Sequence, residues 1–440
     1  MIRDQAPKLR GRGAHRERSA ADTFDSVRPH FRRIGITRIA DITGLDRIGI
    51  PVHNAIVPRS NDVLSVYTGK GLTPIDSMTS AVMEAVERYA GWLPLRPATV
   101  ASYEDLVAAG TPAMRPADLN IELLPQYADH LPIYWVPGHD LVSDETVLVP
   151  TSAVCYGTDP GAPPCYRLGV TNGLASGNTL EEAVCHALCE LVERDALTLS
   201  EIVSGRLSHI LAEGLAGPRR PDQVAQLRQL HPHIDPASVP PSVAGLLDRF
   251  NDAGVSMRLV SITSDLGIPS VLAASAEDNG PTTSKGYGGY GTHPDLEIAM
   301  LRAVTECAQS RAVDIQAMRE DINLPDADVP KHRHHTKRAT TVDLNSWAWR
   351  PAERQVALAE LPSYPSDDVV SDIRMMVARL KDRGLSRVIV VDVSPPDLPV
   401  RVARVVAPGL ESWAVDRSKL GQRAANAWNR ALRRLAPVSA

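Results

Sequence analysis

The sequence lacks the features that would place the protein in a membrane or outside the cell. No stretch approaches the roughly 20 consecutive apolar residues that a membrane-spanning helix needs. The N-terminus is polar and rich in arginine, without the apolar segment of a secretory signal. Cysteine is scarce: the five in 440 residues are an odd number, which we interpret as reduced thiols. These absences predict a cytoplasmic protein that does not bind membranes.

An excess of positive charge is also absent. The formal net charge is −5 and the isoelectric point is about 6.2, which is atypical of a general nucleic-acid binder. The hydrophobic content of 43% is ample for a large core in one domain or two. We expect one domain over residues 1–440, with a basic N-terminal arm at 1–33, a ligand-binding core at 60–415 and a flexible loop at 325–345. A loose arm is the simplest interpretation of residues 1–33.

The most informative stretch is a glycine-rich turn followed by a helical segment, residues 173–195. Asn178 or Thr179 can cap this helix, and apolar residues repeat along one of its faces. Glu190 and Glu193 are three residues apart, so their side chains project side by side. Two like charges at that spacing destabilise a helix by roughly 0.2–0.5 kcal/mol. A solvated helix face is the simplest interpretation of one such pair, and a bound metal ion is the alternative.

The same pattern occurs two more times in the chain. Glycines at 69–71 precede a helical segment with Glu84 and Glu87, and glycines at 286–291 precede one with Glu306. A solvated face has no reason to recur behind glycine-rich segments. Glycines let backbone N–H groups approach phosphate, carboxylates hold Mg²⁺, and arginines neutralise phosphate charge. The repetition therefore predicts one shared site for a polyphosphate and its Mg²⁺ ions.

Strand pairs alternate with helices along the remaining sequence. The predicted strands are a pair within 35–57 around Gly44, then 63–67, 133–136 with 147–149, 256–263 with 270–274, and 388–393 with 400–406. Further helices are predicted at 74–89, 243–253 and 367–383. This alternation predicts an α+β (mixed α/β) fold: pseudo-symmetric halves of largely antiparallel sheet, with helices around one central site.

Two other features have ordinary interpretations. Cys185 and Cys189 are predicted to pack toward the core, and no second pair has the spacing that a Cys-ligated metal site needs. The basic, His-rich run at 330–338 is most simply a solvated loop, with a lid or peptide-contacting loop as the alternative. We expect residues 332–335 to be mobile and dispensable for binding of the predicted polyphosphate.

The three repeated segments resemble the motifs of the YcaO family, ATP-dependent enzymes that modify peptides. The resemblance extends over about residues 8–415. Its motifs are GKG with SAxxExxER at 69–88, GLASGNTxEEA with ExxERDA at 173–196, and GxGxHxxxxxAxxRAxxExxQxR at 289–311.

In that family, ATP lies between these helices and glutamates hold its Mg²⁺ ions. The resemblance implies that the metal ligands are Glu84, Glu87, Glu182, Glu190, Glu193 and Glu306. It implies that the nucleotide is contacted by Arg16, Thr23, Lys70, Ser80, Asn178, Arg194 and Arg302. Arg194, Arg302 and Glu306 are expected to act in catalysis.

Within the family, the N-terminal half is most similar to the TfuA-associated branch. The similarity lies in residues 13–16 and in 35–51, although Ala14 replaces the threonine usual in that branch. Members of the branch are linked to backbone thioamide formation with a TfuA partner. The alternating prolines that end azoline-forming members are absent from the tail.

The resemblance implies that the enzyme activates a backbone amide of a peptide or protein by phosphorylating its oxygen. Thioamide formation, with a TfuA-like partner and sulfide or another sulfur donor, is favoured over azoline formation by a cyclodehydratase. A non-catalytic ATP-binding scaffold is a further alternative, disfavoured because the charged residues of all three motifs are present. A homodimer is left open.

Overall fold

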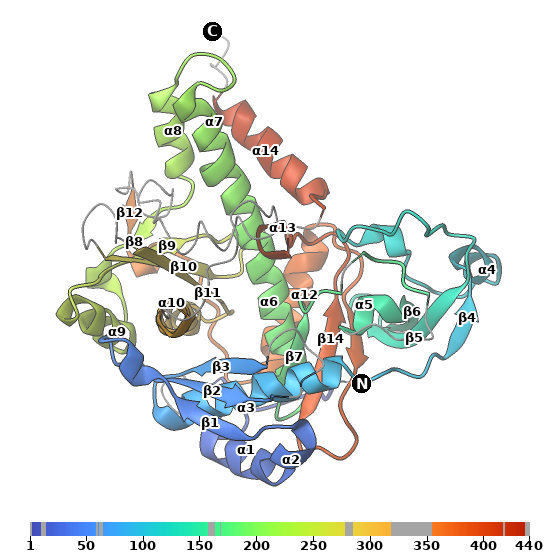
Figure 1. The fold of residues 1–440 in the computed structure, drawn as a ribbon. Helices are drawn as coiled ribbons and strands as arrows, with labels where there is room; N and C mark the ends of the chain where they lie inside the picture. The colour runs from blue at the N-terminus through green and yellow to red at the C-terminus, as the bar shows by residue number, and fades with distance from the viewer. Residues whose placement is uncertain are drawn as a thin grey trace.

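The computed structural model describes residues 2–9, 15–58, 60, 65–156, 163–167, 169–277, 285–317, 354–416 and 419–435. The predicted loop at 325–345, including the His-rich run at 330–338, lies outside these ranges. Three sheets surround the long helix α6, Leu180–Ser200 (Figure 1). Among the described residues, no helix is long and apolar enough to cross a bilayer.

The N-terminal part forms a three-stranded antiparallel sheet with helices packed on it. In the order of the sheet, its strands are β1 (Arg38–Asp41), β2 (Val52–Ile56) and β3 (Val66–Lys70). Its helices are α1 (Ala20–Val27), α2 (Phe31–Ile34) and α3 (Pro74–Gly91). The strand predicted at 63–67 thus starts at Val66. Residues 20–34 are largely helical where a loose arm was the simplest interpretation, because Ser19 caps α1 and Val27 and Ile34 are buried.

The second sheet has six strands and carries α6 and α12 (Val369–Asp382). The order of the sheet is β4 (Thr99–Ala101), β5 (Ile133–Asp140), β13 (Ile389–Asp392), β14 (Arg401–Val406) and β7 (Leu174–Gly177), with β6 (Glu145–Pro150) beside β5. The short helices α4 (Tyr103–Ala108) and α5 (Thr151–Val154) lie in the same part of the chain. The predicted hairpins at 133–149 and 388–406 are confirmed.

The third sheet has five strands and packs against α9 (Pro241–Asp252) and α10 (Leu296–Ala317). Its order is β11 (Lys285–Thr292), β10 (Ser270–Glu277), β9 (Ser256–Ser261), β8 (His233–Ile234) and β12 (Gln355–Val356). Only β8 with β12 is a parallel pair among the described strands. The prediction of a mixed fold with largely antiparallel sheets is therefore confirmed.

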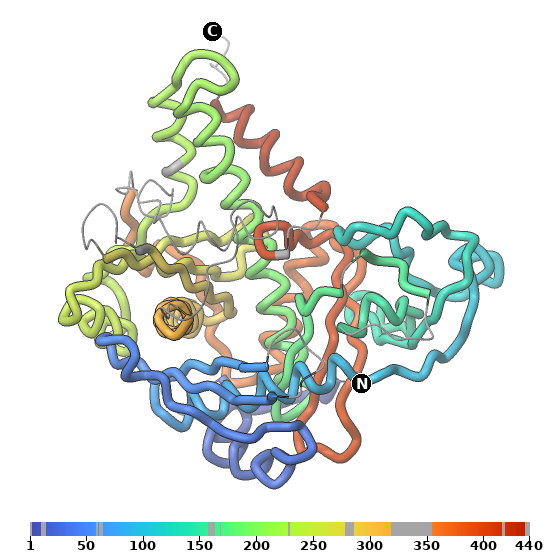
Figure 2. The backbone as a smooth tube through the Cα atoms, in the orientation of Figure 1, coloured from blue at the N-terminus to red at the C-terminus, as the bar shows by residue number. Residues whose placement is uncertain are grey.

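A group of helices projects from the sheets (Figures 1 and 2). Helix α6 continues through a π-helical segment, Glu201–Leu207, into α7. The other helices of this part are α7 (Ser208–Glu213), α8 (Pro221–Arg228), α13 (Trp413–Asp416) and α14 (Gln422–Leu435). Small residues of α14, including Ala424 and Ala427, pack against apolar residues such as Leu199.

The glycines of the three repeated segments bring each strand close to the helix that follows it. An added Cβ would lie 2.1 Å from the backbone of α3 at Gly69, 2.5 Å from the backbone of α6 at Gly177, and 2.0 Å from the backbone of α10 at Gly291. No side chain fits at such distances. These glycines thus let strand and helix pack together, and their predicted approach to phosphate stays a prediction.

Candidate active site

Three carboxylates from two helices form one cluster of the site. Glu84 and Glu87 lie on α3, near Glu190 on α6. Arg88 Nη2 is 3.5 Å from Glu84 Oε1, and Arg88 Nε is 3.9 Å from Glu87 Oε1. Burial raises the pKa of Glu87 well above its ordinary value, Arg88 opposes this, and the charges of Glu190 and Glu84 raise it further. Burial also raises the pKa of Glu84. Repelling, desolvated carboxylates of this kind are suited to a divalent cation.

A second cluster joins α6 to α10. Lys70 donates a hydrogen bond to Glu306 Oε2, and the backbone N–H of Tyr290 donates to Glu306 Oε1 at 3.2 Å. Burial raises the pKa of Glu193 to about 7, and the charge of Glu306 adds to this effect. Burial alone would also raise the pKa of Glu306. The charges of Lys70 and Arg194 outweigh burial, so the pKa of Glu306 is lowered. Arg194 Nη2 also lies 3.5 Å from Glu190 Oε1, so it connects the two clusters.

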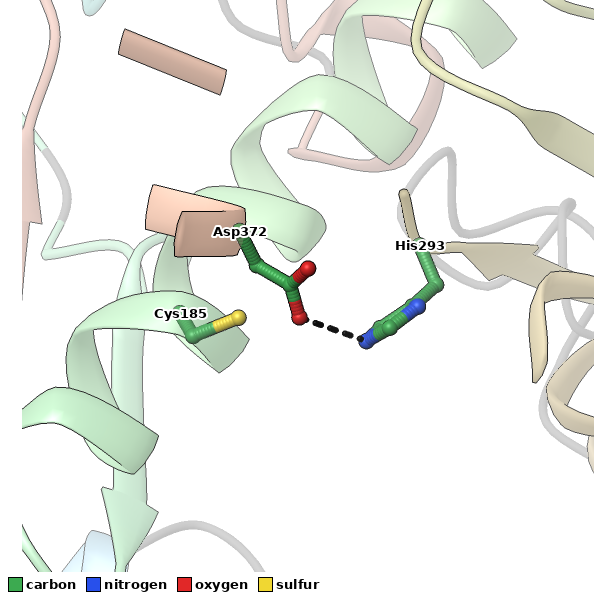
Figure 3. Close-up of side chains that lie close together, drawn as sticks. All are labelled: Cys185, His293 and Asp372. Carbon is green, nitrogen blue, oxygen red and sulfur yellow. Dashed lines mark ion pairs between the residues drawn. The ribbon is translucent and has the colours of Figure 1, made fainter. Parts of the chain in front are cut away.

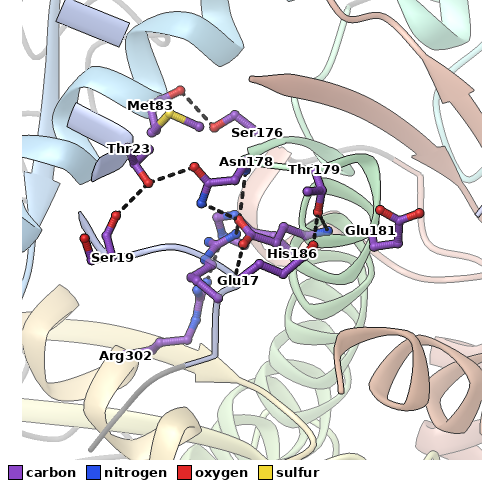
Figure 4. A network of polar contacts seen from close by, with 12 residues as sticks. Glu17, Ser19, Thr23, Met83, Ser176, Asn178, Thr179, Glu181, His186 and Arg302 are labelled. Carbon is purple, nitrogen blue, oxygen red and sulfur yellow. Dashed lines mark hydrogen bonds and ion pairs between the residues drawn. The ribbon is translucent and has the colours of Figure 1, made fainter. Parts of the chain in front are cut away.

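Arg302 lies beside this second cluster and contacts a residue that the sequence analysis missed. Its Nη2 is 3.1 Å from His186 Nε2 (Figure 4). Burial, followed by the charge of Arg302, holds the pKa of His186 well below its ordinary value. The neutral ring therefore accepts the hydrogen bond through Nε2. His186 lies four residues before Glu190 and four after Glu182, and this helical spacing is the signal that would have identified it.

Several buried polar atoms in this region have no hydrogen-bond partner within the described ranges. Glu193 Oε2 and Arg302 Nε are among them. Buried polar groups are nearly always satisfied, so each such atom needs an explanation. A free carboxylate oxygen is a ligand for Mg²⁺, and a free guanidinium N–H is a donor for phosphate. The residues present therefore fit a nucleotide with Mg²⁺.

The N-terminal part of α6 forms a hydrogen-bonded network with the N-terminal segment (Figure 4). Thr23 Oγ1 donates to Asn178 Oδ1 at 2.8 Å. Asn178 in turn donates to Glu182 Oε2 through its backbone N–H at 2.8 Å and its side chain at 2.9 Å. Arg16 Nη1 lies 3.5 Å from the same oxygen, and the backbone N–H of Glu17 donates to the other at 2.6 Å. The structure thus brings together the predicted residues Arg16, Thr23, Asn178 and Glu182.

Glu182 differs from the other predicted metal ligands in its surroundings. It lies eight residues before Glu190 on α6, which is roughly 12 Å along a helix. Its oxygens already accept several hydrogen bonds, so in this structure it orders the N-terminal segment. Its role as a metal ligand stays a prediction. Ser80, four residues before Glu84, lies on the same side of α3, and its predicted contact with nucleotide likewise stays a prediction.

Cys185, His293 and Asp372 form a separate buried group whose ligand atoms lie within 4.8 Å of one another (Figure 3). Lys8 Nζ already pairs with Asp372 Oδ2 at 2.5 Å. His293 Nδ1 accepts from the backbone N–H of Asp295 at 3.0 Å, so in the neutral ring Nε2 carries the proton, 3.7 Å from Asp372. Because the Lys8 ammonium and the His293 N–H already face the Asp372 carboxylate, a metal cation does not fit here. The group instead attaches the N-terminal segment to α6 and α12.

All five cysteines are buried and none is in a disulfide. Cys185 and Cys189 face α12, where Cys189 Sγ is 3.8 Å from Met376 Sδ. Their predicted packing toward the core is confirmed. A cavity of about 250 Å³ lies elsewhere, lined by residues such as Ile2, His139 and Asp392, and none of its lining residues belongs to the site described above.

The fold and the site together define a class of protein: a mixed α/β protein with buried carboxylates and guanidinium groups arranged for a nucleotide and its cations. The chain belongs to the YcaO family. The sequence model of that family, described as an ATP- and Mg²⁺-binding YcaO cyclodehydratase, matches residues 68–411. The predictions of the family and of ATP and Mg²⁺ as its ligands are confirmed.

Relatives in distant organisms resemble nearly the whole chain. An uncharacterised protein of Methanothermobacter thermautotrophicus is 33% identical over 92% of this chain and 97% of its own length. An uncharacterised protein of Rhizobium leguminosarum bv. trifolii, from the tfuA 3′ region, is 35% identical over 92% of this chain and 91% of its own.

Solved structures share the fold at lower identity. A heterocyclase in complex with substrate and cofactor has a TM-score of 0.73 at 22% identity. The match covers 96% of this chain and 56% of the heterocyclase chain. YcaO from Methanopyrus kandleri, bound with AMPPCP and Mg²⁺, has a TM-score of 0.65 at 23% identity and covers 92% of this chain and 95% of its own. The predicted YcaO-type fold is confirmed.

Proposed function

We propose that this protein activates a peptide backbone amide with ATP and Mg²⁺ so that sulfide can convert the amide to a thioamide. The observation that carries the activation step is the pair of partly buried carboxylate clusters joined by Arg194. The preference for a thioamide is supported by the relative from the tfuA 3′ region and by the similarity of residues 35–51 to the TfuA-associated branch.

The chemistry explains why the site combines these charges. An amide carbonyl is a weak electrophile, and its oxygen is a poor leaving group. ATP, when bound, supplies a phosphoryl group that makes this oxygen able to leave. The chain holds and neutralises the phosphates with Arg302 and Lys70, while Glu84, Glu87 and Glu190 on one side and Glu193 and Glu306 on the other hold Mg²⁺. Positioning and electrostatic stabilisation account for most of the catalysis of phosphoryl transfer.

The second step requires a nucleophile but no redox change. Hydrosulfide forms a C–S bond, the C–O bond breaks, and the amide oxygen leaves within inorganic phosphate. The overall reaction converts an amide, ATP and hydrosulfide into a thioamide, ADP and phosphate. A TfuA-like protein is the proposed partner for supplying sulfur. A neighbour of the same fold, E. coli microcin synthetase, was solved as a complex of several proteins with its precursor peptide, at a TM-score of 0.58 and 15% identity.

Mass spectrometry of the cognate peptide tests the proposal. The peptide is incubated with this protein, the TfuA-like partner, ATP, Mg²⁺ and sulfide. Thioamide formation replaces oxygen with sulfur and makes the peptide heavier, whereas azoline formation removes water and makes it lighter. Both reactions consume ATP, so hydrolysis alone does not separate them. A water-loss product formed equally well without sulfide would refute the thioamide and favour the azoline.

A further inference from the structure

A buried arginine on β14 has acidic neighbours but no ion pair with any described residue. This residue, Arg404, is 3% exposed. Its Nε donates to the backbone oxygen of Ala153 at 3.1 Å, and its Nη1 is buried without a hydrogen-bond partner. Burial lowers the pKa of Arg404 to about 10, so the guanidinium stays charged at neutral pH. A buried charge that is neither paired nor fully hydrogen-bonded is strongly disfavoured unless a ligand compensates it.

Arg404 lines a small cavity that contains a second unsatisfied polar group. The cavity has a volume of about 40 Å³, which exceeds what one water molecule needs. Asn172 also lines it, and its Oδ1 is buried without a partner within the described ranges. Most of the other lining side chains are apolar, among them Leu191 and Leu410. The cavity therefore presents one positive charge, that of the Arg404 guanidinium, in mostly apolar surroundings. Such surroundings disfavour a large or highly charged ligand.

The cavity adjoins the first carboxylate cluster. Leu191 lines it, and the preceding residue on α6, Glu190, belongs to that cluster. Glu190 and Glu87 are also near enough to Arg404 to oppose the effect of burial on its pKa. An anion in the cavity would thus lie behind the carboxylates that are proposed to hold Mg²⁺.

We propose that this cavity binds a small monoanion, and that during turnover it holds the hydrosulfide whose sulfur enters the thioamide. The second part rests on the proposed function. Hydrosulfide and chloride are monoanions of similar size, so either one satisfies the charge of Arg404. Hydrosulfide has a weak S–H donor that suits the open Oδ1 of Asn172. An azoline-forming enzyme draws its nucleophile from the substrate peptide and has no use for such a site.

Direct binding experiments test the anion site without turnover. Crystals of the full-length protein are soaked in sodium bromide, and anomalous scattering should place bromide within hydrogen-bond distance of Arg404 Nη1. In solution, the wild-type protein should broaden the chloride NMR line, and anaerobic addition of hydrosulfide should reverse the broadening. The proposal would be overturned if well-ordered crystals showed no bromide in the cavity and the wild-type protein did not broaden the chloride NMR line.

Steady-state kinetics test the role of hydrosulfide. Arg404→Met should raise the KM for sulfide about tenfold or more, as expected for loss of a charged hydrogen-bond partner, and leave the KM for ATP unchanged. Arg404→Lys should restore part of the affinity. Arg401→Met, on the same strand but half-exposed, is the matched control and should behave as wild type.

The outcomes separate the two proposals. Bromide bound at Arg404 together with an unchanged KM for sulfide in Arg404→Met would assign the cavity to a structural anion and overturn the hydrosulfide role. A water-loss product would overturn the thioamide reaction, and the bromide and chloride measurements would still decide whether the anion site exists.

Discussion

At the scale of single residues, burial and charge repulsion act together on the carboxylates of the site, and Glu193 shows this most clearly. Its folded pKa is about 7 against an ordinary value of 4.5, because burial and Glu306 disfavour the charged carboxylate. The folded state thus binds a proton more tightly there than the unfolded state does. This contribution to stability is fully present below the ordinary pKa and is lost as pH rises through about 7.

The first prediction concerns this pH dependence. Without ligands, wild-type stability should fall between about pH 4.5 and 7 relative to Glu193→Gln, by an amount on the order of 3 kcal/mol. Chemical denaturation of both proteins across this range measures the difference. Binding of Mg²⁺ and ATP should release protons from the wild type, detectable by calorimetry in buffers of different ionisation enthalpy. If the stability of the wild type and of Glu193→Gln changed with pH in the same way over this range, Glu193 would not titrate there.

A second prediction separates function from folding. Glu190→Gln and Arg302→Ala should each lower ATP hydrolysis by about a hundredfold or more, because each removes a charge that we propose binds the phosphates or their cations. Both side chains are only partly buried, so the melting temperatures should stay close to wild type. The control is Glu213→Gln, which also removes one negative charge. Glu213 is exposed on α7, in the helices that project from the sheets and away from the site. Wild-type hydrolysis in either site variant would show that the site is assigned to the wrong residues.

At the scale of elements, the glycine-bearing strands set the position of the helices that carry the charges. The sequence predicts the three units correctly, because glycine-rich segments and spaced carboxylates are both local patterns. It does not predict what the glycines do. The direction in which each missing Cβ would point depends on the packing of β3, β7 and β11 against α3, α6 and α10, and that packing is not encoded in a local pattern.

A third prediction follows from that packing. In Gly291→Ala, the added Cβ would lie 2.0 Å from the backbone oxygen of Ala299, so α10 must move away from β11. The shift should displace Arg302 and Glu306 and lower ATP affinity. Gly245→Ala, on α9 with no atom within 4 Å of the added Cβ, is the matched control. Nucleotide affinity equal to wild type in Gly291→Ala would mean that the position of α10 does not determine binding.

The N-terminal segment shows where sequence reasoning stops. Lys8 and Asp372 are far apart in the chain, and neither belongs to a recognisable motif. In the structure they form a buried ion pair at 2.5 Å, and Lys8 Nζ also donates to the backbone oxygen of Ser366 at 2.9 Å. The backbone N–H of Ala6 donates to Asp368 Oδ2 at 2.6 Å. These contacts attach the segment that carries Arg16 to α12.

A fourth prediction tests this attachment. Lys8→Met should destabilise the protein by about 3–5 kcal/mol, because it leaves the Asp372 carboxylate buried without its cation. It should also weaken ATP binding if Arg16 contacts phosphate. The double variant Lys8→Met with Asp372→Asn should recover most of the stability. Asp4→Asn, which alters a fully exposed ion pair with Arg374, should have little effect. Equal stability of Lys8→Met and wild type would refute the structural role of the pair.

At the scale of the whole molecule, one buried residue links helix α14 to the part of α6 that carries the candidate site. Asp195 is fully buried on α6 and directly follows Arg194. Arg423 of α14 donates two hydrogen bonds to it, each of 2.8 Å, and also pairs with Asp265 at 2.7 Å. The backbone N–H of Glu411 donates to Asp195 at 3.1 Å. Helix α14 is thereby fixed to the turn of α6 that joins the two carboxylate clusters.

The last prediction concerns this connection. Burial raises the pKa of Asp195 and Arg423 lowers it, so in Arg423→Gln the pKa should rise further, opposed only by the hydrogen bond from the backbone N–H of Glu411. The variant should lose about 3–5 kcal/mol near neutral pH, because the carboxylate is then buried without its partner. The loss should shrink in acid, since a carboxyl group with a raised pKa stabilises the folded state only while it is protonated. Asp195→Asn combined with Arg423→Gln should recover most of the stability at neutral pH and remove this pH dependence. Denaturation curves at several pH values measure both effects. If Arg423→Gln lost the same stability at every pH, the loss would arise from the packing of α14 and not from the charge of Asp195.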